Sequence, residues 1–292
     1  MVIAHPDDEI FVSGTLCLLR EGGFETHLLC VTDGSGSDSA LLATLAQWSP
    51  PRDIRRLELQ LSAKALGVST VSLLDYPDAS APGWSGDCPW DQQALAADIS
   101  KRIAELEPSL ILTHGPQGGY GHPAHKQTFH SVMRAAEICG FSGSVYSFCG
   151  KASSLDYLWR YFDQPSDLLV DVREFVSRRA ASLSYHQSQK DFFLKPIIPR
   201  TLRGGAGLLL GLGLSFSKRG RRRIPIVSAE GFFRRFPTEG LVLQRKPSAT
   251  SEDFFRRHFE HDRRITHVGG AASPARAQPE RQPHKAAARA GA

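Results

Sequence analysis

The segment Met1-Val2-Ile3-Ala4-His5-Pro6-Asp7-Asp8-Glu9 joins a short apolar run to a polar corner, and a stretch that can be helical follows it. A second copy of the corner reads Gly121-His122-Pro123-Ala124-His125-Lys126. In both copies a proline follows a histidine at the expected start of a helix, where its missing N–H costs no hydrogen bond. Each copy carries a further side chain that can bind metal three residues after the histidine, Asp8 in the first and His125 in the second. The two corners therefore predict two strand-to-helix turns that present polar side chains to one site.

Short apolar runs alternate with amphipathic stretches along the first half of the chain, as in a parallel sheet covered by helices on both faces. The expected strands are Val2–Ala4, His27–Thr32, Thr70–Leu74, Leu110–Thr113 and Ser144–Phe148. The expected helices are Ile10–Arg20, Arg52–Leu66, Gln92–Glu107 and Pro123–Ile138. We therefore predict an α/β fold with a mostly parallel, Rossmann-like sheet. Ligands bind beyond the carboxyl ends of the strands in such sheets, where both His-Pro corners are expected to lie.

After Gly150 the alternation weakens, and we expect an irregular α/β C-terminal part. Strands are expected at Leu168–Val172 and Gly240–Gln244, with a helix at Arg173–Ser188. The predicted organisation is a metal-binding catalytic core, a C-terminal part of the catalytic domain with substrate-side loops, a peripheral segment and a disordered basic tail. These four parts are residues 1–150, 151–247, 248–268 and 269–292. The tail is rich in Ala, Pro, Gly and Arg and has no periodicity, which is typical of disorder.

Composition places the chain among globular proteins. Its 292 residues are 41% hydrophobic, which is enough for the core of one large domain. Its five cysteines are an odd number without a CxxC pair, which disfavours disulfides and a cysteine zinc site and favours a reducing compartment. No charged-then-apolar signal precedes the first expected strand, so we expect a cytoplasmic protein. The apolar run before His5 would barely cross a sheet, which leaves open whether residues precede Met1.

The net charge of +5 is concentrated in two places. The tail from Gly269 carries +3, and Lys218-Arg219-Gly220-Arg221-Arg222-Arg223 is a second basic cluster. The sequence shows no basic platform interleaved with aromatic residues, so we expect no nucleic-acid partner. The apolar, glycine-rich stretch 205–214 is too short to span a bilayer. We expect it to be a loop or lid; the alternative is membrane association by weak contact of residues 200–223 with a membrane surface.

Three side chains of the two corners have the composition of a catalytic metal site. His5, Asp8 and His125 supply two imidazoles and one carboxylate, and three protein ligands leave a position for water on a zinc ion. The same ligands also suit ferrous iron. A metal-bound water ionises near neutral pH, and Asp7 beside a ligand can act as its general base. The alternative for Asp7 and Asp8 is helix capping alone, because the helix dipole favours aspartate in a first turn.

The histidine left over, His122, is expected to complement the metal. As an imidazolium it can stabilise an oxyanion and protonate a leaving amine. The alternative is a histidine that only caps the helix. Tyr120 follows Gly118-Gly119 and precedes Gly121, so we expect it on a loop beside the site, either in contact with substrate or packed within the loop.

Together, His5-Pro6-Asp7-Asp8-Glu9 and Gly118-Gly119-Tyr120-Gly121-His122-Pro123-Ala124-His125 resemble the PIG-L/LmbE-like zinc deacetylases over residues 1–150. Looser matches are Thr32-Asp33-Gly34, Arg55-Arg56-Leu57-Glu58 with Leu66-Gly67, Tyr76-Pro77-Asp78, His186-Gln187-Ser188-Gln189 and Ala229-Glu230-Gly231-Phe232. The resemblance implies zinc ligation by His5, Asp8 and His125. It also implies Asp7 as the base and His122 as the acid or oxyanion partner.

The resemblance further implies that Arg55 and Asp78 lie near the sugar. For Arg55 the alternative is a surface charge or an ion pair with Glu58, and for Asp78 it is ordinary turn chemistry. One position departs from the family pattern, because Ala124 stands where close relatives usually carry an acidic residue. A carboxylate there would favour charged His122, so we expect a lower pKa for His122 unless another acid replaces it in space.

The resemblance implies removal of an acetyl group from an N-acetylated amino sugar on a glycan, a glycolipid or a small-molecule conjugate. Two alternatives stay open. One is a zinc amidase acting on a thiol conjugate or an acylated metabolite, and the other is a catalytically silent sugar-binding module. The presence of ligands, base and candidate acid together disfavours the silent module.

Overall fold

The computed structural model describes residues 1–36, 39–78, 88–119, 121–148, 164–189, 228–248 and 252–268. Three features predicted from the sequence lie outside these residues: Tyr120, the segment 200–223 and the tail from 269. Within the described residues, no helix has both the length and the apolar content needed to span a membrane.

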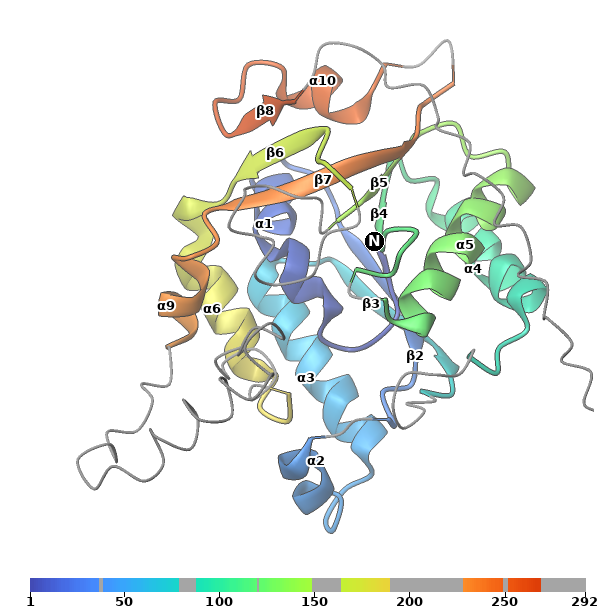
Figure 1. Ribbon diagram of the computed structural model, residues 1–292, viewed down its shortest axis with the longest axis vertical. Coiled ribbons are helices and arrows are strands. Elements are labelled where there is room, and N and C mark those ends of the chain that lie inside the picture. The colour runs from blue at the N-terminus through green and yellow to red at the C-terminus, as the bar shows by residue number, and fades with distance from the viewer. Residues whose placement is uncertain are drawn as a thin grey trace, which may run out of the picture.

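Parallel strands form the centre of the molecule (Figure 1). β1 (Val2–Ile3), β2 (His27–Thr32) and β3 (Thr70–Tyr76) pair in parallel in that order. β4 (Leu110–Thr113) pairs in parallel with β5 (Ser144–Ser147), and β1 contacts β4. The two hydrogen-bonded sheets, β1-β2-β3 and β4-β5-β7-β6-β8, are therefore neighbours through β1 and β4, and the winding of the chain reverses between these two strands. Open α/β sheets bind their ligands at such a switch point.

The C-terminal part extends the sheet with antiparallel strands. β7 (Thr238–Arg245) lies between β5 and β6 (Leu168–Asp171) and is antiparallel to both. β8 (Ile265–His267) continues the sheet on the far side of β6. The predicted α/β fold is confirmed. Pairing is parallel within β1-β2-β3 and between β4 and β5, and it is antiparallel at β7, β6 and β8, which lie in the expected C-terminal part.

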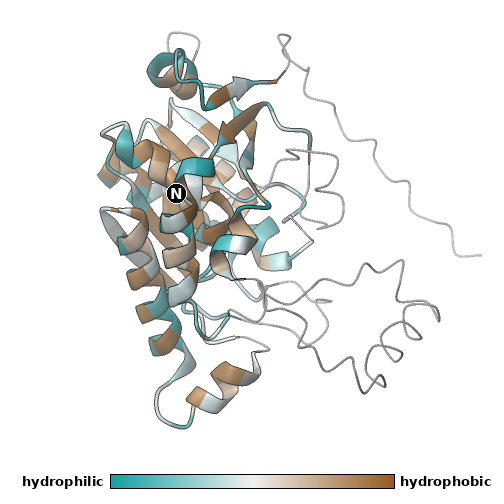
Figure 2. Cartoon of the chain, turned by 90° about the vertical axis from the view of Figure 1, so that its left-hand side faces the viewer, coloured by the Kyte–Doolittle hydropathy of each residue, from teal (hydrophilic) through white to brown (hydrophobic). Residues whose placement is uncertain are grey.

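Helices cover both faces of the sheet, as predicted (Figures 1 and 2). Alternate strand residues face opposite layers, since the side-chain period of a strand is two. Ile3, Leu28 and Cys30 pack with one layer, whereas Val2 and Leu29 pack with the other. The first layer contains α1 (Ser13–Glu21), α3 (Pro51–Leu66) and α6 (Val176–Tyr185), and the second contains α4 (Gln92–Leu106) and α5 (Pro123–Ile138).

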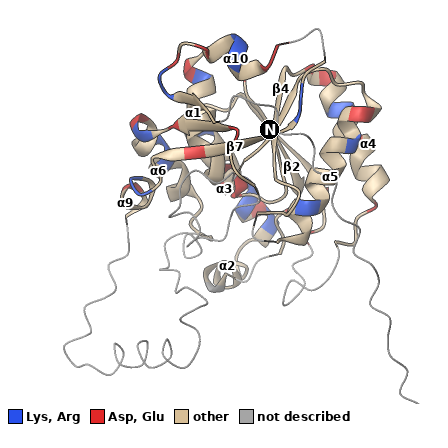
Figure 3. Ribbon diagram, turned by 45° about the horizontal axis from the view of Figure 1, so that its top comes forward, with Lys and Arg blue, Asp and Glu red and all other residues tan. Residues whose placement is uncertain are grey.

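Short helices that the sequence pattern did not reveal complete the described chain. They are α2 (Ala40–Leu45), α9 (Ala229–Phe233) and α10 (Phe254–Phe259), whereas the 3-10 helix η3 (Arg173–Phe175) lies within the predicted helix Arg173–Ser188. Charged residues gather on the peripheral helices α4 and α10 (Figure 3), yet Phe255 of α10 is fully buried in the core. The predicted helix Arg173–Ser188 ends at Tyr185, and residues 186–189 form a turn.

The first His-Pro corner differs from its prediction, while the second agrees with it. α5 begins at Pro123 with His122 as its N-cap. In the first corner, however, the 3-10 helix η1 (Asp8–Val12) begins only at Asp8, so Pro6 is not a first helical residue. Asp7 has a φ of 136°, which interrupts any helix there. The physical reason is local, because the Asp8 carboxylate accepts the backbone N–H of His5 at 2.7 Å and closes a turn before the helix starts.

Candidate metal centre

The two His-Pro corners meet at the carboxyl ends of β1 and β4. His5 Nδ1 lies 3.2 Å from His125 Nε2 and 3.5 Å from Asp8 Oδ2, and His125 Nε2 lies 3.2 Å from Asp8 Oδ1. Ligand atoms of a tetrahedral zinc ion at about 2.0–2.2 Å are about 3.3–3.6 Å apart. The three predicted ligands are therefore brought together at distances close to those around one metal ion, with Asp8 facing His5 through Oδ2 and His125 through Oδ1.

The glycine-rich loop before α5 orients His125. The Nδ1 atom of His125 lies 3.3 Å from the carbonyl oxygen of Gly118, which leaves Nε2 to face Asp8 and His5. A partner at the second ring nitrogen fixes the tautomer and the direction of a ligating histidine. Gly118 has a φ of 70°, and a Cβ atom there would lie 2.6 Å from the His122 carbonyl oxygen. This position therefore requires glycine.

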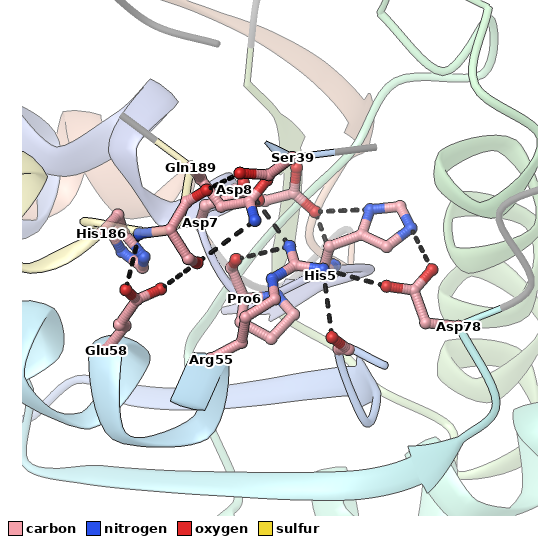
Figure 4. A network of polar contacts seen from close by, with 12 residues as sticks. His5, Pro6, Asp7, Asp8, Ser39, Arg55, Glu58, Asp78, His186 and Gln189 are labelled. Carbon is pink, nitrogen blue, oxygen red and sulfur yellow. Dashed lines mark hydrogen bonds and ion pairs between the residues drawn. The ribbon is translucent and has the colours of Figure 1, made fainter. Parts of the chain in front are cut away.

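Asp78 and Arg55 lie behind His5 (Figure 4). Asp78 Oδ1 is 3.6 Å from His5 Nε2, and Asp78 Oδ2 accepts a hydrogen bond from Arg55 Nη1 at 3.0 Å. Arg55 also donates to the carbonyl oxygens of Pro6 at 2.9 Å and Gly36 at 2.8 Å, and it is buried. Both side chains thus hold the first corner from within the protein. Their predicted contact with a sugar stays a prediction.

Asp7 stands beside the ligands and is less enclosed than they are. Its side chain is 14% exposed, against 3% for Asp8, and its Oδ2 lies 3.5 Å from Arg55 Nη2. Burial raises the pKa of Asp7 to about 7; Arg55 opposes this shift and the charge of Asp8 adds to it. A carboxylate with such a pKa can exchange a proton near neutral pH. Its role as the base remains a prediction that this geometry supports.

His122 lies next to the ligands, with its ring centroid 4.6 Å from that of His5 and 4.7 Å from that of His125. Its Nδ1 accepts the backbone N–H of Ala124 at 3.2 Å, so this nitrogen carries no proton and the ring is neutral. Burial lowers the pKa of His122 to about 2, and His5 and His125 add to the effect. Ala124 packs in an apolar cluster with residues of α4. In this conformation His122 donates from Nε2 alone, and its catalytic role stays a prediction.

Sequence reasoning missed His114, which directly follows β4. Its ring stacks on His125 at a centroid distance of 4.0 Å, and its Nε2 lies 3.3 Å from Asp8 Oδ2. Two groups of side chains have ligand atoms within 4.8 Å of one another: Asp8, His114 and His125, and His5, His122 and His125. However, His114 Nε2 accepts the backbone N–H of Ala4 at 3.0 Å, which occupies the lone pair that a metal would need. This contact favours His5 over His114 as the residue that binds a metal together with Asp8 and His125. His114 could have been identified from the sequence as a candidate site residue, because it directly follows the expected strand Leu110–Thr113, at its carboxyl end.

Comparison with known proteins covers the first half of the chain best. Residues 1–136 match the family model described as PIG-L: GlcNAc-PI de-N-acetylase. The 1D-myo-inositol 2-acetamido-2-deoxy-alpha-D-glucopyranoside deacetylase 2 of Catenulispora acidiphila is 36% identical over 160 residues, which are 50% of this chain and 53% of that protein. The chain spans about half the length of the curated relatives it matches.

Solved structures share the fold at low sequence identity. N,N'-diacetylchitobiose deacetylase from Pyrococcus horikoshii aligns with a TM-score of 0.51 at 19% identity, over 83% of this chain and 81% of that chain. GalB, the 4-carboxy-2-hydroxymuconate hydratase of Pseudomonas putida KT2440, aligns with a TM-score of 0.54 at 19% identity, over 86% and 97% of the two chains. Since a deacetylase and a hydratase share this fold, the reaction has to be argued from the site.

Proposed function

Residues 1–136 match the PIG-L family, as the two His-Pro corners predicted, and from this premise we propose that the protein is a zinc-dependent N-deacetylase of an N-acetylated amino sugar. The observation that carries the proposal is the spacing of 3.2–3.5 Å among the donor atoms of His5, Asp8 and His125. The curated relatives, which are named as deacetylases of an acetamido sugar on inositol, support a small sugar conjugate as the substrate class.

His5, Asp8 and His125 would hold the metal. When bound, a zinc ion would lower the pKa of a coordinated water and polarise the amide carbonyl. Asp78 and the Gly118 carbonyl group would keep the two imidazoles directed at it, because each faces the second ring nitrogen of one ligand. Ferrous iron suits the same donors, so the identity of the metal is part of the test.

Asp7 carries the proton transfers in the proposed reaction. It takes the proton that water loses as the water oxygen attacks the acetyl carbonyl carbon. The C–N bond then breaks, the nitrogen takes that proton from Asp7, and acetate and the free amine leave. A carboxylate whose pKa lies near 7 can serve as acceptor and then as donor.

His122 stabilises the charge that develops on the carbonyl oxygen. Its Nε2–H donates a hydrogen bond to this oxygen, while the Ala124 N–H holds Nδ1 and fixes the ring. A neutral imidazole performs this role without titrating. The proposed mechanism therefore keeps the oxyanion role that the sequence suggested for His122 and gives the proton of the leaving amine to Asp7.

The test is an assay for free amine with the zinc-loaded full chain and a panel of N-acetyl compounds. The panel contains N-acetylglucosaminyl-inositol, N,N'-diacetylchitobiose, an N-acetylglucosaminyl lipid and an N-acetylated thiol conjugate. We expect zinc-dependent release from a sugar substrate and one zinc ion per chain. Release from the thiol conjugate alone would favour the amidase, and bound metal without any release would favour a silent module.

Two histidines of α5 provide matched variants for this assay. His125→Ala should lose both metal and turnover, because it removes a proposed ligand. His130→Ala should retain both, because His130 is exposed on the same helix. A protein that binds no metal after zinc supplementation would contradict the proposed site.

A further inference from the structure

Glu9 is completely buried although it directly follows Asp8 in the first His-Pro corner, residues 5–9, which is called the metal corner below. Its Oε1 accepts the hydroxyl of Ser62 at 2.5 Å and lies 2.5 Å from Nε2 of His186. A buried carboxylate is costly unless donors compensate the loss of water. The contacts with Ser62 and His186 therefore compensate Oε1 of Glu9 for the loss of water.

His186 reaches Glu9 from the turn that follows α6, and it is also completely buried. Burial acts to lower the pKa of His186, but the charge and hydrogen bond of Glu9, together with the charges of Asp7 and Glu58, raise it overall. The contact of 2.5 Å between His186 Nε2 and Glu9 Oε1 joins two completely buried side chains. The contact connects the turn after α6 to η1.

α3 supports this arrangement with a row of buried polar side chains. Arg55, Glu58 and Ser62 are spaced by three and four residues, so they lie on one face of the helix. Arg55 holds the first corner, and Ser62 contacts Glu9. Glu58 accepts the backbone N–H of Ser188 at 2.8 Å and its hydroxyl at 2.5 Å, which attaches the turn 186–189 to the same helix.

We propose that His186 is a positioning residue of the metal corner: through Glu9 it fixes η1, and with it the directions in which Asp7 and Asp8 point. The argument is geometric. Glu9 is the second residue of η1, Asp8 is its first, and the carboxylate of Asp8 is directed by the same short turn that Glu9 anchors. The inference rests on the proposed metal site and not on the identity of the amide that the enzyme cleaves.

The test measures zinc affinity of the full chain by competition with a chromogenic chelator. Removal of a partner that orients a metal ligand typically weakens metal binding about 10–100-fold, and we expect this loss in His186→Ala. His186→Gln should recover most of it, because its amide can still donate to Glu9. With an accepted substrate, kcat should fall in His186→Ala while KM stays close to that of the wild type.

Ser188→Ala is the matched control, since it removes a donor to a different buried carboxylate, Glu58, from the same turn. It should lower the thermal midpoint and leave zinc affinity close to the wild-type value. Wild-type zinc affinity in folded His186→Ala would overturn the proposal, as would an equal loss in Ser188→Ala.

Glu9→Met keeps roughly the size of the side chain but removes the oxygen that faces His186, and it replaces His186→Ala if that variant does not fold. Unchanged zinc affinity in folded Glu9→Met overturns the proposal, and a loss of about 10–100-fold supports it. Chelator competition measures zinc affinity and not turnover. It therefore tests the role of His186 even if the deacetylase assay is negative.

Discussion

The Oδ1 atom of Asp78 lies 3.6 Å from Nε2 of His5, while Nδ1 of the same ring faces Asp8 and His125. The other oxygen of Asp78 accepts a hydrogen bond from Arg55 at 3.0 Å. A carboxylate at the second nitrogen of a ligating histidine fixes the orientation and the tautomer of the ring. Asp78 therefore connects the arginine of α3 to the metal corner.

Asp78→Asn should weaken zinc binding about 10–100-fold, because the ring of His5 loses its charged partner. Stability should fall as well, since Arg55 is buried and loses one of the two carboxylates, Asp7 and Asp78, that lie beside its charge. Chelator competition and a thermal melt measure the two effects. Asp98→Asn is the control, because Asp98 is exposed and accepts only the Tyr76 hydroxyl among the hydrogen bonds described here. Equal zinc affinity in the two variants would contradict the role of Asp78.

Asp7→Asn should retain zinc and lower kcat about 10²–10⁴-fold, which is the usual contribution of a general base. The reason is that asparagine keeps the shape of the side chain but accepts no proton. Metal analysis and turnover are measured on the same preparation. Asp53→Asn, which changes an exposed carboxylate of α3, should resemble the wild type. Undiminished turnover in Asp7→Asn would rule out Asp7 as the base.

His114 should make the metal-free protein less stable as the pH falls from about 6.5 to about 4, whereas the raised pKa of Asp7 acts in the opposite direction. Burial lowers the pKa of His114 to about 4 and the proximity of His125 adds to it, while Asp8 opposes the shift. In that range the unfolded chain binds a proton at His114 that the folded chain does not, so acid favours unfolding. This residue should contribute up to about 1.4 kcal/mol per pH unit.

His114→Gln isolates this contribution, because the glutamine oxygen can accept the Ala4 N–H but does not titrate. Urea midpoints measured with a chelator at several pH values should fall less steeply for the variant. His122, whose pKa is lowered to about 2, contributes the same change of stability with pH in the wild type and in His114→Gln. Parallel curves would mean that His114 is charged in the folded state.

Gly118→Ala should be more harmful than Gly119→Ala. Both glycines have left-handed backbones, with φ of 70° and 64°, so alanine costs about 1–2 kcal/mol at either position. At Gly118 the added Cβ would also lie 2.6 Å from the His122 carbonyl oxygen, whereas no atom of the described residues beyond its chain neighbours lies within 4 Å of a Cβ at Gly119. Gly118→Ala should therefore weaken metal binding in addition, because the Gly118 carbonyl group orients His125.

Thermal midpoints and zinc affinities of the two alanine variants provide the comparison. If the thermal midpoint and the zinc affinity fall equally in both variants, backbone strain alone explains the effect of alanine in this loop.

Much of the fold was predictable because its signals are local. The bounds of β2, β4 and α5 agree with the predictions at both ends, and all three depend on an apolar run or on a proline at a helix start. The first corner shows the limit of such signals. Pro6 stands in the same local motif as Pro123, yet the bond from the His5 N–H to Asp8 closes a turn that delays the helix.

The sequence by itself determined which chemical groups stand at the ends of two strands, because strand, turn and helix preferences act between near neighbours. It therefore predicted His5, Asp8 and His125 as one group. Only the tertiary structure decided what surrounds them. Asp78 behind His5, His114 against His125 and the pair of Glu9 with His186, 177 residues away, depend on how the helices pack on the sheet. Contacts between such distant segments have no local pattern from which they can be read.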